Sequence, residues 1–379
     1  MTASVPIRPR HPDRGHATTP VRIAGPLVAG LLLAACGPSP VDMVEHPVTT
    51  TPSRVAGEEL QRSAEPDEAC AGAPAPAEFT GPGQRRVASA GPVADRVEVP
   101  RSPERILALG AGAVDVACAL GLQDLVVGTS GLPGDADVLL PRTLVDLPDI
   151  GIPGGVVPGD VAAAARDLRP DLIVLADAPG RDPAVARALS EVAPTVVYDA
   201  DVLRWTDATE AISDAYGRPR AGGEVLLDVI DRARATTAGT TPSDTRVSLV
   251  SIVEDGDGDG VVPQDPDTLG SLMLEAVGAV RPPAQRTRDG ERLPPLPESP
   301  ALGDPLDGDV IFTVLGGGES SEEIARDVFA SDRWLDLDAV GARRMFVVDR
   351  AVWEGAGPVA ARAVLTDIAE SINGIAPDG

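Results

Sequence analysis

The chain has 379 residues, 43% of them hydrophobic, and a formal charge of −26 at pH 7. This length and apolar content allow a large core in about two domains. The negative charge argues against nucleic acid as a partner and against close contact with an anionic membrane surface, because both would repel the chain.

All three histidines, His11, His16 and His46, precede the sequence that we expect to fold. A folded part without histidine cannot form a Ser-His-Asp triad, use a histidine base, or ligate haem or zinc through imidazole. We therefore expect a protein that is not an enzyme and that has no tightly bound cofactor.

Residues 1–35 are predicted to be a signal peptide. Four arginines precede an apolar run at 23–35, which is too short and too interrupted by glycine and proline to span a bilayer comfortably. The run ends in Ala34-Ala35-Cys36, which looks like a bacterial lipobox and implies cleavage before Cys36 and lipidation of its thiol. We expect a protein anchored by lipid on the extracytoplasmic face of the cell membrane; the alternative is an ordinary export signal with an incidental cysteine.

Residues 36–94 are rich in Pro, Ala, Gly, Thr and Glu and have no apolar period, which predicts a flexible, lipidated tether. Folded sequence is expected to start near Arg96. Two further cysteines remain, Cys70 and Cys118. In an exported protein such a pair favours a disulfide, although one buried and one free thiol are the alternative.

The first lobe is expected at 95–217. Apolar runs at 105–109, 172–176 and 195–198 are typical of buried parallel strands, and helical patterns lie between them. Ligands bind outside the carboxyl ends of such strands, here around 177–180. Gly110 and Gly112 begin a dinucleotide-binding pattern, but its third glycine is replaced by Asp115, so we interpret them as a tight turn from strand to helix.

A long helix at about 220–236, within a linker at 218–238, leads to a second lobe at 239–379. This lobe repeats the plan of the first, with strands expected at 247–253, 310–315 and 345–348 and a closing helix at 359–371. The sequence thus predicts an α/β protein with two Rossmann-like three-layer lobes, joined by a single long helix, and a ligand cleft between them.

An acidic turn interrupts the second lobe. Asp255, Asp257 and Asp259 match the first half of a calcium loop, and Gly260 follows as such a loop requires. Pro266 occupies the position of the bidentate glutamate. A solvated turn and a calcium site are both left open by this pattern.

Several short stretches share their order and spacing with one family. They are PERI at 103–106, DLPDIG at 146–151, LRPDLIV at 168–174, APTV at 193–196 and VGAVRPPAQR at 277–286. Together they resemble class III, helical-backbone solute-binding lipoproteins of ABC importers, especially actinobacterial ones for iron–siderophores or haem; a narrower subgroup has cysteines matching Cys70 and Cys118. The resemblance covers about 96–372. It implies capture of a ferric siderophore or haem between the lobes and delivery to permease subunits, by a protein that we expect to be a monomer.

The resemblance also implies a pocket formed by the loops after the strands. Ferric siderophores are bulky and usually anionic or neutral, so arginines and an aromatic wall would suit them. We expect Arg286, Arg288 and Trp353 to supply these groups, with solvated arginines and a core tryptophan as the alternatives. The other expected ligand-binding residues are Gly110, Ala111, Thr129, Ser130, Gly151 and Asp177.

One acidic residue per lobe is implied to dock on the permease: Asp182 in the first lobe and Glu322 or Glu323 in the second. Asp182 also suits a helix N-cap. Because the only tyrosines are Tyr198 and Tyr216 and no histidine lies in the folded part, we favour a siderophore over haem. Cobalamin binding by the same fold, and an envelope lipoprotein without a transport role, are the alternative functions.

Overall fold

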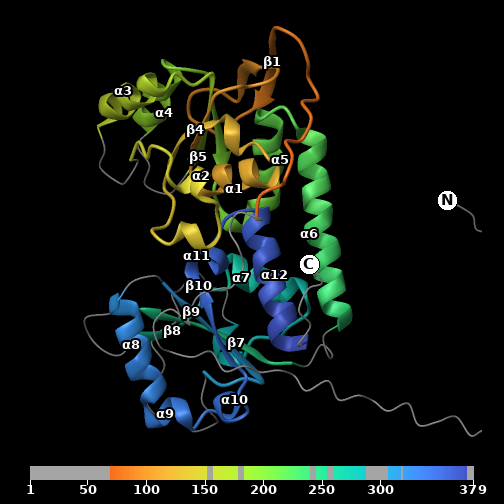
Figure 1. Ribbon diagram of the computed structural model, residues 1–379, viewed down its shortest axis with the longest axis vertical. Helices are drawn as coiled ribbons and strands as arrows, with labels where there is room; N and C mark the ends of the chain where they lie inside the picture. The colour runs from red at the N-terminus through yellow and green to blue at the C-terminus, as the bar shows by residue number, and fades with distance from the viewer. Residues whose placement is uncertain are drawn as a thin grey trace, which may run out of the picture. The chain divides into compact units, whose positions relative to one another are not determined.

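The computed structural model describes residues 69–151, 157–177, 183–239, 245–253, 260–286, 306–316 and 319–373. In these ranges the chain forms two α/β lobes, and the long helix α6 (Pro219–Gly239) leads from one to the other (Figure 1). The predicted α/β class with two lobes is confirmed. No helix in the described ranges is both long enough and apolar enough to cross a bilayer.

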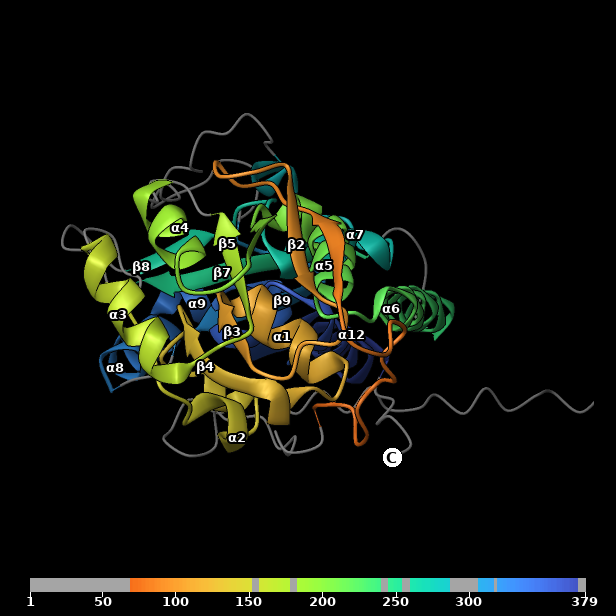
Figure 2. The same cartoon turned by 90° about the horizontal axis from the view of Figure 1, so that it is seen from above.

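The first lobe is built on a parallel sheet with the strand order β4-β3-β5-β6. Its side chains alternate between two faces: Ile106 and Ala108 join the core formed with α1 and α5, whereas Leu107 and Leu109 pack with α3 and α4. Figure 2 shows these two helix pairs on opposite sides of the sheet. The strands are β3 (Ile106–Leu109), β4 (Val126–Ser130), β5 (Leu172–Asp177) and β6 (Thr195–Asp199), and the helices are α1 (Ala111–Ala119), α2 (Arg142–Val145), α3 (Pro158–Leu168), α4 (Pro183–Ser190) and α5 (Trp205–Ala215).

The second lobe has the strand order β10-β9-β7-β8, in which β8 (Gly260–Pro263) runs antiparallel to β7. This edge strand was not predicted, because its short apolar run ends at once in Pro263. The other strands are β7 (Val247–Val253), β9 (Val310–Leu315) and β10 (Met345–Asp349), and the helices are α7 (Leu269–Ala276), α8 (Glu319–Ala330), α9 (Asp332–Leu335), α10 (Asp338–Gly341), α11 (Arg350–Trp353) and α12 (Pro358–Asn373). Short 3-10 turns are η3 (Gln123–Leu125), η4 (Ala136–Val138), η5 (Val202–Arg204) and η6 (Pro283–Gln285).

One hydrophobic core joins the two lobes. Helix α12 of the second lobe packs against α1 of the first lobe and against α6 and α7. Val114 of α1, Val229 of α6 and Val364 of α12 are all buried in the same cluster. The lobes therefore share apolar contacts beside α6, and these contacts fix the region where the lobes meet.

The folded part begins earlier than we predicted. Strand β1 (Gln84–Ala88) pairs in antiparallel register with β2 (Arg96–Pro100), so a flexible tether reaching residue 94 and a fold starting near Arg96 are both wrong. An ion pair of 2.9 Å between Arg85 and Asp214 attaches β1 to the end of α5. Composition alone does not register such a long-range polar contact.

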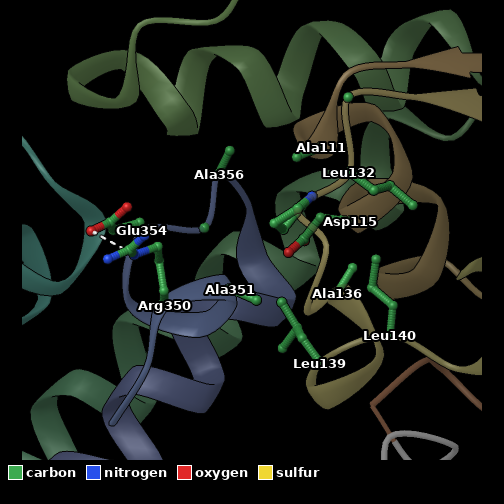
Figure 3. A pocket seen from close by; sticks show the side chains of 13 residues that line it. Ala111, Asp115, Leu132, Ala136, Leu139, Leu140, Arg350, Ala351, Glu354 and Ala356 are labelled. Carbon is green, nitrogen blue, oxygen red and sulfur yellow. Dashed lines mark ion pairs between the residues drawn. The ribbon is translucent and has the colours of Figure 1, made fainter. Parts of the chain in front are cut away.

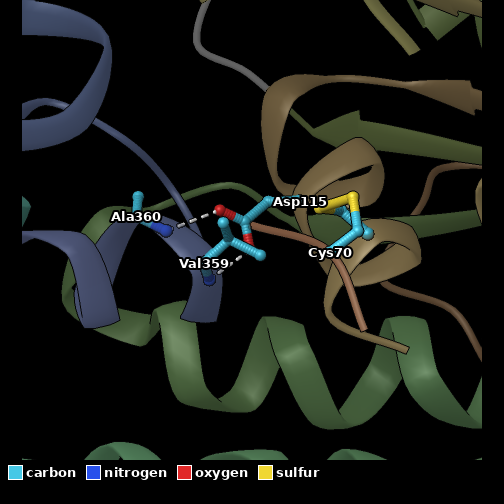
Figure 4. Close-up of a disulfide and its surroundings, with 5 residues drawn as sticks. Cys70, Asp115, Val359 and Ala360 are labelled. Carbon is cyan, nitrogen blue, oxygen red and sulfur yellow. Dashed lines mark hydrogen bonds between the residues drawn. A yellow bond between two sulfur atoms is a disulfide. The ribbon is translucent and has the colours of Figure 1, made fainter. Parts of the chain in front are cut away.

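A disulfide attaches the segment before β1 to the first lobe. Cys70 and Cys118 are bonded, which confirms the predicted pairing (Figure 4). The backbone after Cys70 is hydrogen-bonded to the end of α1 and the residue that follows it: Ala71 N–H donates to Cys118 O at 3.0 Å, and Ala75 N–H donates to Leu120 O at 2.8 Å. These bonds hold an Ala- and Pro-rich stretch that has no apolar period of its own.

Candidate functional site

Two adjoining cavities lie at the carboxyl ends of the strands of the first sheet. The first has a volume of about 340 Å³ and the second about 240 Å³, and Ala111, Gly131 and Ala356 line both. Ala111 and Gly131 come shortly after β3 and β4, whereas Ala356 precedes α12 of the second lobe. The cavities therefore lie where the lobes meet, and the ends of parallel strands are the usual place for a ligand in an open α/β sheet.

Gly110 makes the turn from β3 into α1. Its φ is 124°, and a Cβ atom there would lie 2.6 Å from Ala176 Cβ and 2.6 Å from the Tyr198 hydroxyl. Only glycine fits both the conformation and the space. The predicted tight turn is confirmed, and it places the start of α1 against Tyr198, whose hydroxyl accepts the Ala113 N–H at 3.3 Å.

Apart from Asp115, the side chains of the first lobe that line the first cavity are small or aliphatic (Figure 3). Its polar groups on the opposite side are Arg350 and Glu354, whose charged atoms are 3.8 Å apart. Arg350 also donates to Ile252 O at 3.3 Å. Its guanidinium thus already has protein partners at the cavity wall. The first-lobe residues of this wall are Ala111, Asp115, Gly131, Leu132, Pro133, Ala136, Leu139 and Leu140.

The second cavity combines aromatic and acidic groups. Tyr198 and Trp205 line it, and so do Asp199 and Asp201. Asp201 accepts the Leu203 N–H at 3.0 Å and so caps η5. Among the described residues, no arginine lines this cavity.

Asp115 connects the lobes. Its two carboxylate oxygens accept the backbone N–H groups of Val359, at 2.8 Å, and Ala360, at 3.0 Å, so a first-lobe side chain caps the second-lobe helix α12 (Figure 4). Gly357 is required beside it, because a Cβ atom there would lie 2.4 Å from Asp115 Oδ1. Burial raises the pKa of Asp115 to about 6, although the two N–H donors oppose this shift.

Comparisons with known proteins agree with this architecture. A probable siderophore-binding lipoprotein of Bacillus subtilis, YfiY, is 25% identical over 279 residues, which cover 72% of this chain and 83% of the relative. The crystal structure of Staphylococcus aureus SirA with staphyloferrin B superposes with a TM-score of 0.57 at 20% identity, covering 76% of this chain and 98% of that one. A FhuD-fold-family periplasmic binding protein of a ferrichrome ABC transporter from B. subtilis has a TM-score of 0.57 at 19% identity, with coverages of 76% and 99%.

The chain has the FhuD fold. No protein-family model matches it. The predicted resemblance to class III siderophore-type solute-binding proteins is confirmed by the fold and by the lipoprotein relative. These similar proteins are described as binding proteins and not as enzymes.

Three of the six predicted pocket residues of the first lobe line a cavity, and three do not. Gly110, Ala111 and Ser130 line the cavities. Thr129 is buried, and its backbone bonds to the loop at 148–150. The remaining two lie elsewhere: Gly151 donates its N–H to Asp149 at 2.7 Å, and the side chain of Asp177 is exposed at the end of β5.

Trp353 does not form the predicted aromatic wall. It is 1% exposed, its ring centroid lies 4.7 Å from that of Phe312, and its indole N–H donates to Asp367 at 2.8 Å. Gly270 provides room for the ring, because a Cβ atom there would come within 2.4 Å of it. Trp353 is a core residue, and the tryptophan at the cavity is Trp205.

In the arginine-rich turn after α7, Arg281 faces inward whereas Arg286 is exposed. Arg281 donates to Gln285 Oε1, to Ser271 Oγ and to the carbonyls of Leu249 and Gln264, all between 2.9 and 3.1 Å. Burial lowers the pKa of Arg281 to about 10, so it stays charged at neutral pH. The predicted ligand residue Arg286 is exposed, donates to Arg281 O and lines neither cavity.

Several predicted residues fall outside the described ranges: Cys36, Asp182, Arg288 and the acidic turn with Asp255, Asp257 and Asp259. Glu322 and Glu323 are both in α8, and the side chain of Glu323 is exposed. In the described ranges, no group of three or more His, Cys, Asp or Glu side chains could hold a metal ion. Asp115 and Trp205 were missed as site residues; a single acid within the apolar run at 113–120 was the available signal for Asp115.

Proposed function

We propose that this chain is the substrate-binding lipoprotein of an ABC importer and that it captures a ferric siderophore between its lobes for delivery to a permease. The observation that carries the proposal is the pair of adjoining cavities at the carboxyl ends of the first sheet. The second lobe lines the first cavity with residues 350, 351 and 354–356 and the second cavity with Ala356. The fold shared with siderophore-binding proteins and the siderophore-binding lipoprotein relative support the same ligand class.

Haem is less well supported as the ligand. The histidines lie at 11, 16 and 46, Cys70 and Cys118 are bonded to each other, and Met273 and Met345 are buried, so tyrosine is the haem-iron ligand to consider in the described ranges. Tyr216 is buried and donates its hydroxyl to Ala113 O at 2.8 Å, and the Tyr198 hydroxyl accepts the Ala113 N–H. Both phenols already contact the backbone of α1.

A titration followed by tryptophan fluorescence tests the function. The purified protein is titrated with ferric siderophores of several classes, haem and cobalamin. We expect a ferric siderophore to quench Trp205, which lines the second cavity. The Trp205→Phe variant should lose most of the quenching but bind in calorimetry, whereas Trp334→Phe, which changes a buried tryptophan packed on Phe329, should keep it. Absence of binding by every siderophore would overturn the proposal, and binding of cobalamin alone would support that alternative.

Uptake separates transport from a purely envelope role. Cells that lack the protein should lose uptake of ⁵⁵Fe supplied as the bound chelate, and the unaltered gene should restore it. Normal uptake in the deletion strain would favour an envelope lipoprotein without a transport role.

Permease docking is proposed to use Asp182 and the acidic start of α8. The exposed side chain of Glu323 suits an arginine on a membrane subunit. Replacing Glu322 and Glu323 by Gln together should impair uptake while chelate affinity is unchanged. Asp327→Asn, one turn later and also exposed on α8, is the matched control and should leave uptake normal. Equal uptake by both variants would contradict docking at this end of α8.

Anchoring is proposed to occur through lipid on Cys36, with residues from 37 to about 68 as the spacer on the extracytoplasmic side. Labelling with radioactive palmitate should mark the wild-type protein, and Cys36→Ser should abolish the label and release the protein from the membrane fraction. Membrane retention of the unlabelled variant would contradict a lipid anchor at this residue.

A further inference from the structure

We infer that the bound chelate has a net charge of zero or above, and that a cationic group on it would contact Asp199 and Asp201 beside Tyr198 and Trp205. This rests on the proposed function and specifies the ligand class. Among the described residues, the charged groups that line the two cavities are four carboxylates, on Asp115, Asp199, Asp201 and Glu354, and one guanidinium, on Arg350.

The guanidinium at the first cavity has protein partners already. Arg350 pairs with Glu354 and donates to the Ile252 carbonyl. An anionic chelate that used Arg350 would have to compete with a carboxylate. Arg281, in the arginine-rich stretch that the sequence singled out, is committed to carbonyl and side-chain oxygens within the second lobe. The guanidinium of Arg350 is therefore shared with a carboxylate, although its Nε makes no hydrogen bond, and no second guanidinium among the described residues lines either cavity.

The second cavity has an excess of negative charge even after Arg204, which pairs with one of its acids, is counted. Arg204 pairs with Asp199 and with Asp207, both at 3.0 Å. Together with Asp201, these groups make three carboxylates against one guanidinium. Asp177 adds a fourth carboxylate, because it is the register partner of Asp199 on the neighbouring strand. We therefore expect the potential in this cavity to be negative, which repels anions and attracts cations.

The aromatic side chains next to these acids suit a cation as well. Tyr198 and Trp205 line the same cavity as Asp199 and Asp201. The face of an aromatic ring attracts an ammonium group, and a carboxylate beside it completes the charge. A ferric tris-hydroxamate fits this description, because its three monoanionic groups neutralise Fe³⁺, and a further amine makes the complex cationic. A ferric tris-catecholate carries three negative charges and does not fit.

Three ferric chelates that share the same iron coordination but differ in charge test the preference. Ferrioxamine B has a protonated terminal amine, its N-acetyl derivative is neutral, and its N-succinyl derivative has a carboxylate at the same place. We expect Kd to rise about ten-fold from the amine form to the acetyl form, and about ten-fold again from the acetyl form to the succinyl form. Each step lowers the charge of the chelate by one, and one charge pair near a protein surface produces an effect of this size. The differences should shrink as salt is added. Equal affinities, or tightest binding of the carboxylate form, would overturn the inference.

Two variants locate the preference. Asp201→Asn keeps an oxygen to cap η5 but removes a charge, so it should reduce the advantage of the amine form by about ten-fold. Asp207→Asn, in the same Arg204 cluster but not lining the cavity, should change it by less than about three-fold because its charge is farther away. Equal changes in both variants would contradict contact with Asp201.

A wider panel distinguishes this inference from the proposed function. Ferric tris-catecholate and ferric citrate are titrated beside the three hydroxamates. Tightest binding of either anion would overturn the charge preference while the siderophore-binding function stands. Absence of binding by all of them would overturn both.

Discussion

Asp115 in the first lobe and Arg281 in the second are charged side chains that packing largely shields from water, and the two are used differently. Asp115 in the first lobe reaches across to cap α12 of the second, whereas Arg281 in the second lobe binds oxygens of its own lobe. Each is satisfied by hydrogen bonds to uncharged groups rather than by an opposite charge within bonding distance. The contrast shows that a shielded charge can join two lobes, as Asp115 does, or can stabilise a single lobe, as Arg281 does.

The largest effect is expected from removing the charge in the second lobe. Arg281→Met should lower the free energy of unfolding by about 3–5 kcal/mol, because it removes the charged donor to the Gln264 carbonyl and to Gln285 Oε1, which keeps its bond from the Leu249 N–H. The matched control is Arg286→Met, an exposed arginine five residues later, which should cost less than about 1 kcal/mol. Urea unfolding followed by circular dichroism measures both. Similar losses for the two variants would mean that the Arg281 contacts do not stabilise the lobe.

The next effect concerns the covalent attachment of α1, which carries Asp115. Cys70→Ala removes the disulfide to Cys118, which closes a loop with a sequence separation of 48, and should cost about 2–4 kcal/mol. Hydrogen exchange should quicken in residues 71–79 and in α1, but not around Arg281. A reductant should destabilise the wild type by a similar amount and leave the variant unchanged. Uniform loss of protection in both lobes would contradict a local role.

The third effect is a pH dependence of the free energy of unfolding, which we expect from Asp115. Its pKa is about 6 in the folded protein, against 3.8 for an ordinary aspartate carboxyl group, so the folded state binds the proton more tightly. The stability contributed by the protonated carboxyl is therefore fully present below pH 4 and is lost as the pH rises through 6. Relative to Asp115→Asn, the wild type should lose up to about 3 kcal/mol between pH 4 and 7.

Unfolding in urea at closely spaced pH values measures this difference. Gly357→Ala is a useful companion variant, because its added Cβ atom would displace the Asp115 carboxylate without removing the charge. That variant should be destabilised at every pH in the series. A constant difference between wild type and Asp115→Asn from pH 4 to 7 would contradict a raised pKa at this position.

The smallest effect is expected at Trp353. Trp353→Phe keeps the ring contact with Phe312 but loses the hydrogen bond to Asp367, which should cost about 1 kcal/mol. Ligand affinity should change by less than about two-fold, because the ring does not reach either cavity. A ten-fold loss of affinity in calorimetry would restore the aromatic wall that the sequence suggested.

The fold was largely predictable because its signals are local. Continuous apolar runs such as 172–176 identify buried strands, and Gly110 identifies a turn that no other residue fits. The same logic placed Gly110, Ala111 and Ser130 at the strand ends, where the cavities are. Strand β1 escaped prediction because a distant ion pair, Arg85 with Asp214, helps to hold it.

The rest of the site depends on contacts between distant residues. Asp115 caps a helix that begins more than two hundred positions later, and no spacing within the sequence encodes that pairing. Trp353 and Arg281 have the chemistry of ligand-binding residues, but their partners, Asp367 and Gln285, turn them into core residues. Residue type indicated which side chains have the chemistry to bind a ligand, but their packing determines which of them a ligand can reach.

The attachment of the N-terminal segment also determines how the protein bears mechanical load. A pull on the chain before Ala69 meets the sulfur–sulfur bond of Cys70 first and passes through Cys118 into α1. The hydrogen bonds of Ala71 and Ala75 lie beyond that bond and are relieved of the force. Because Asp115 of α1 also caps α12, tension enters the protein beside the contact that joins the two lobes.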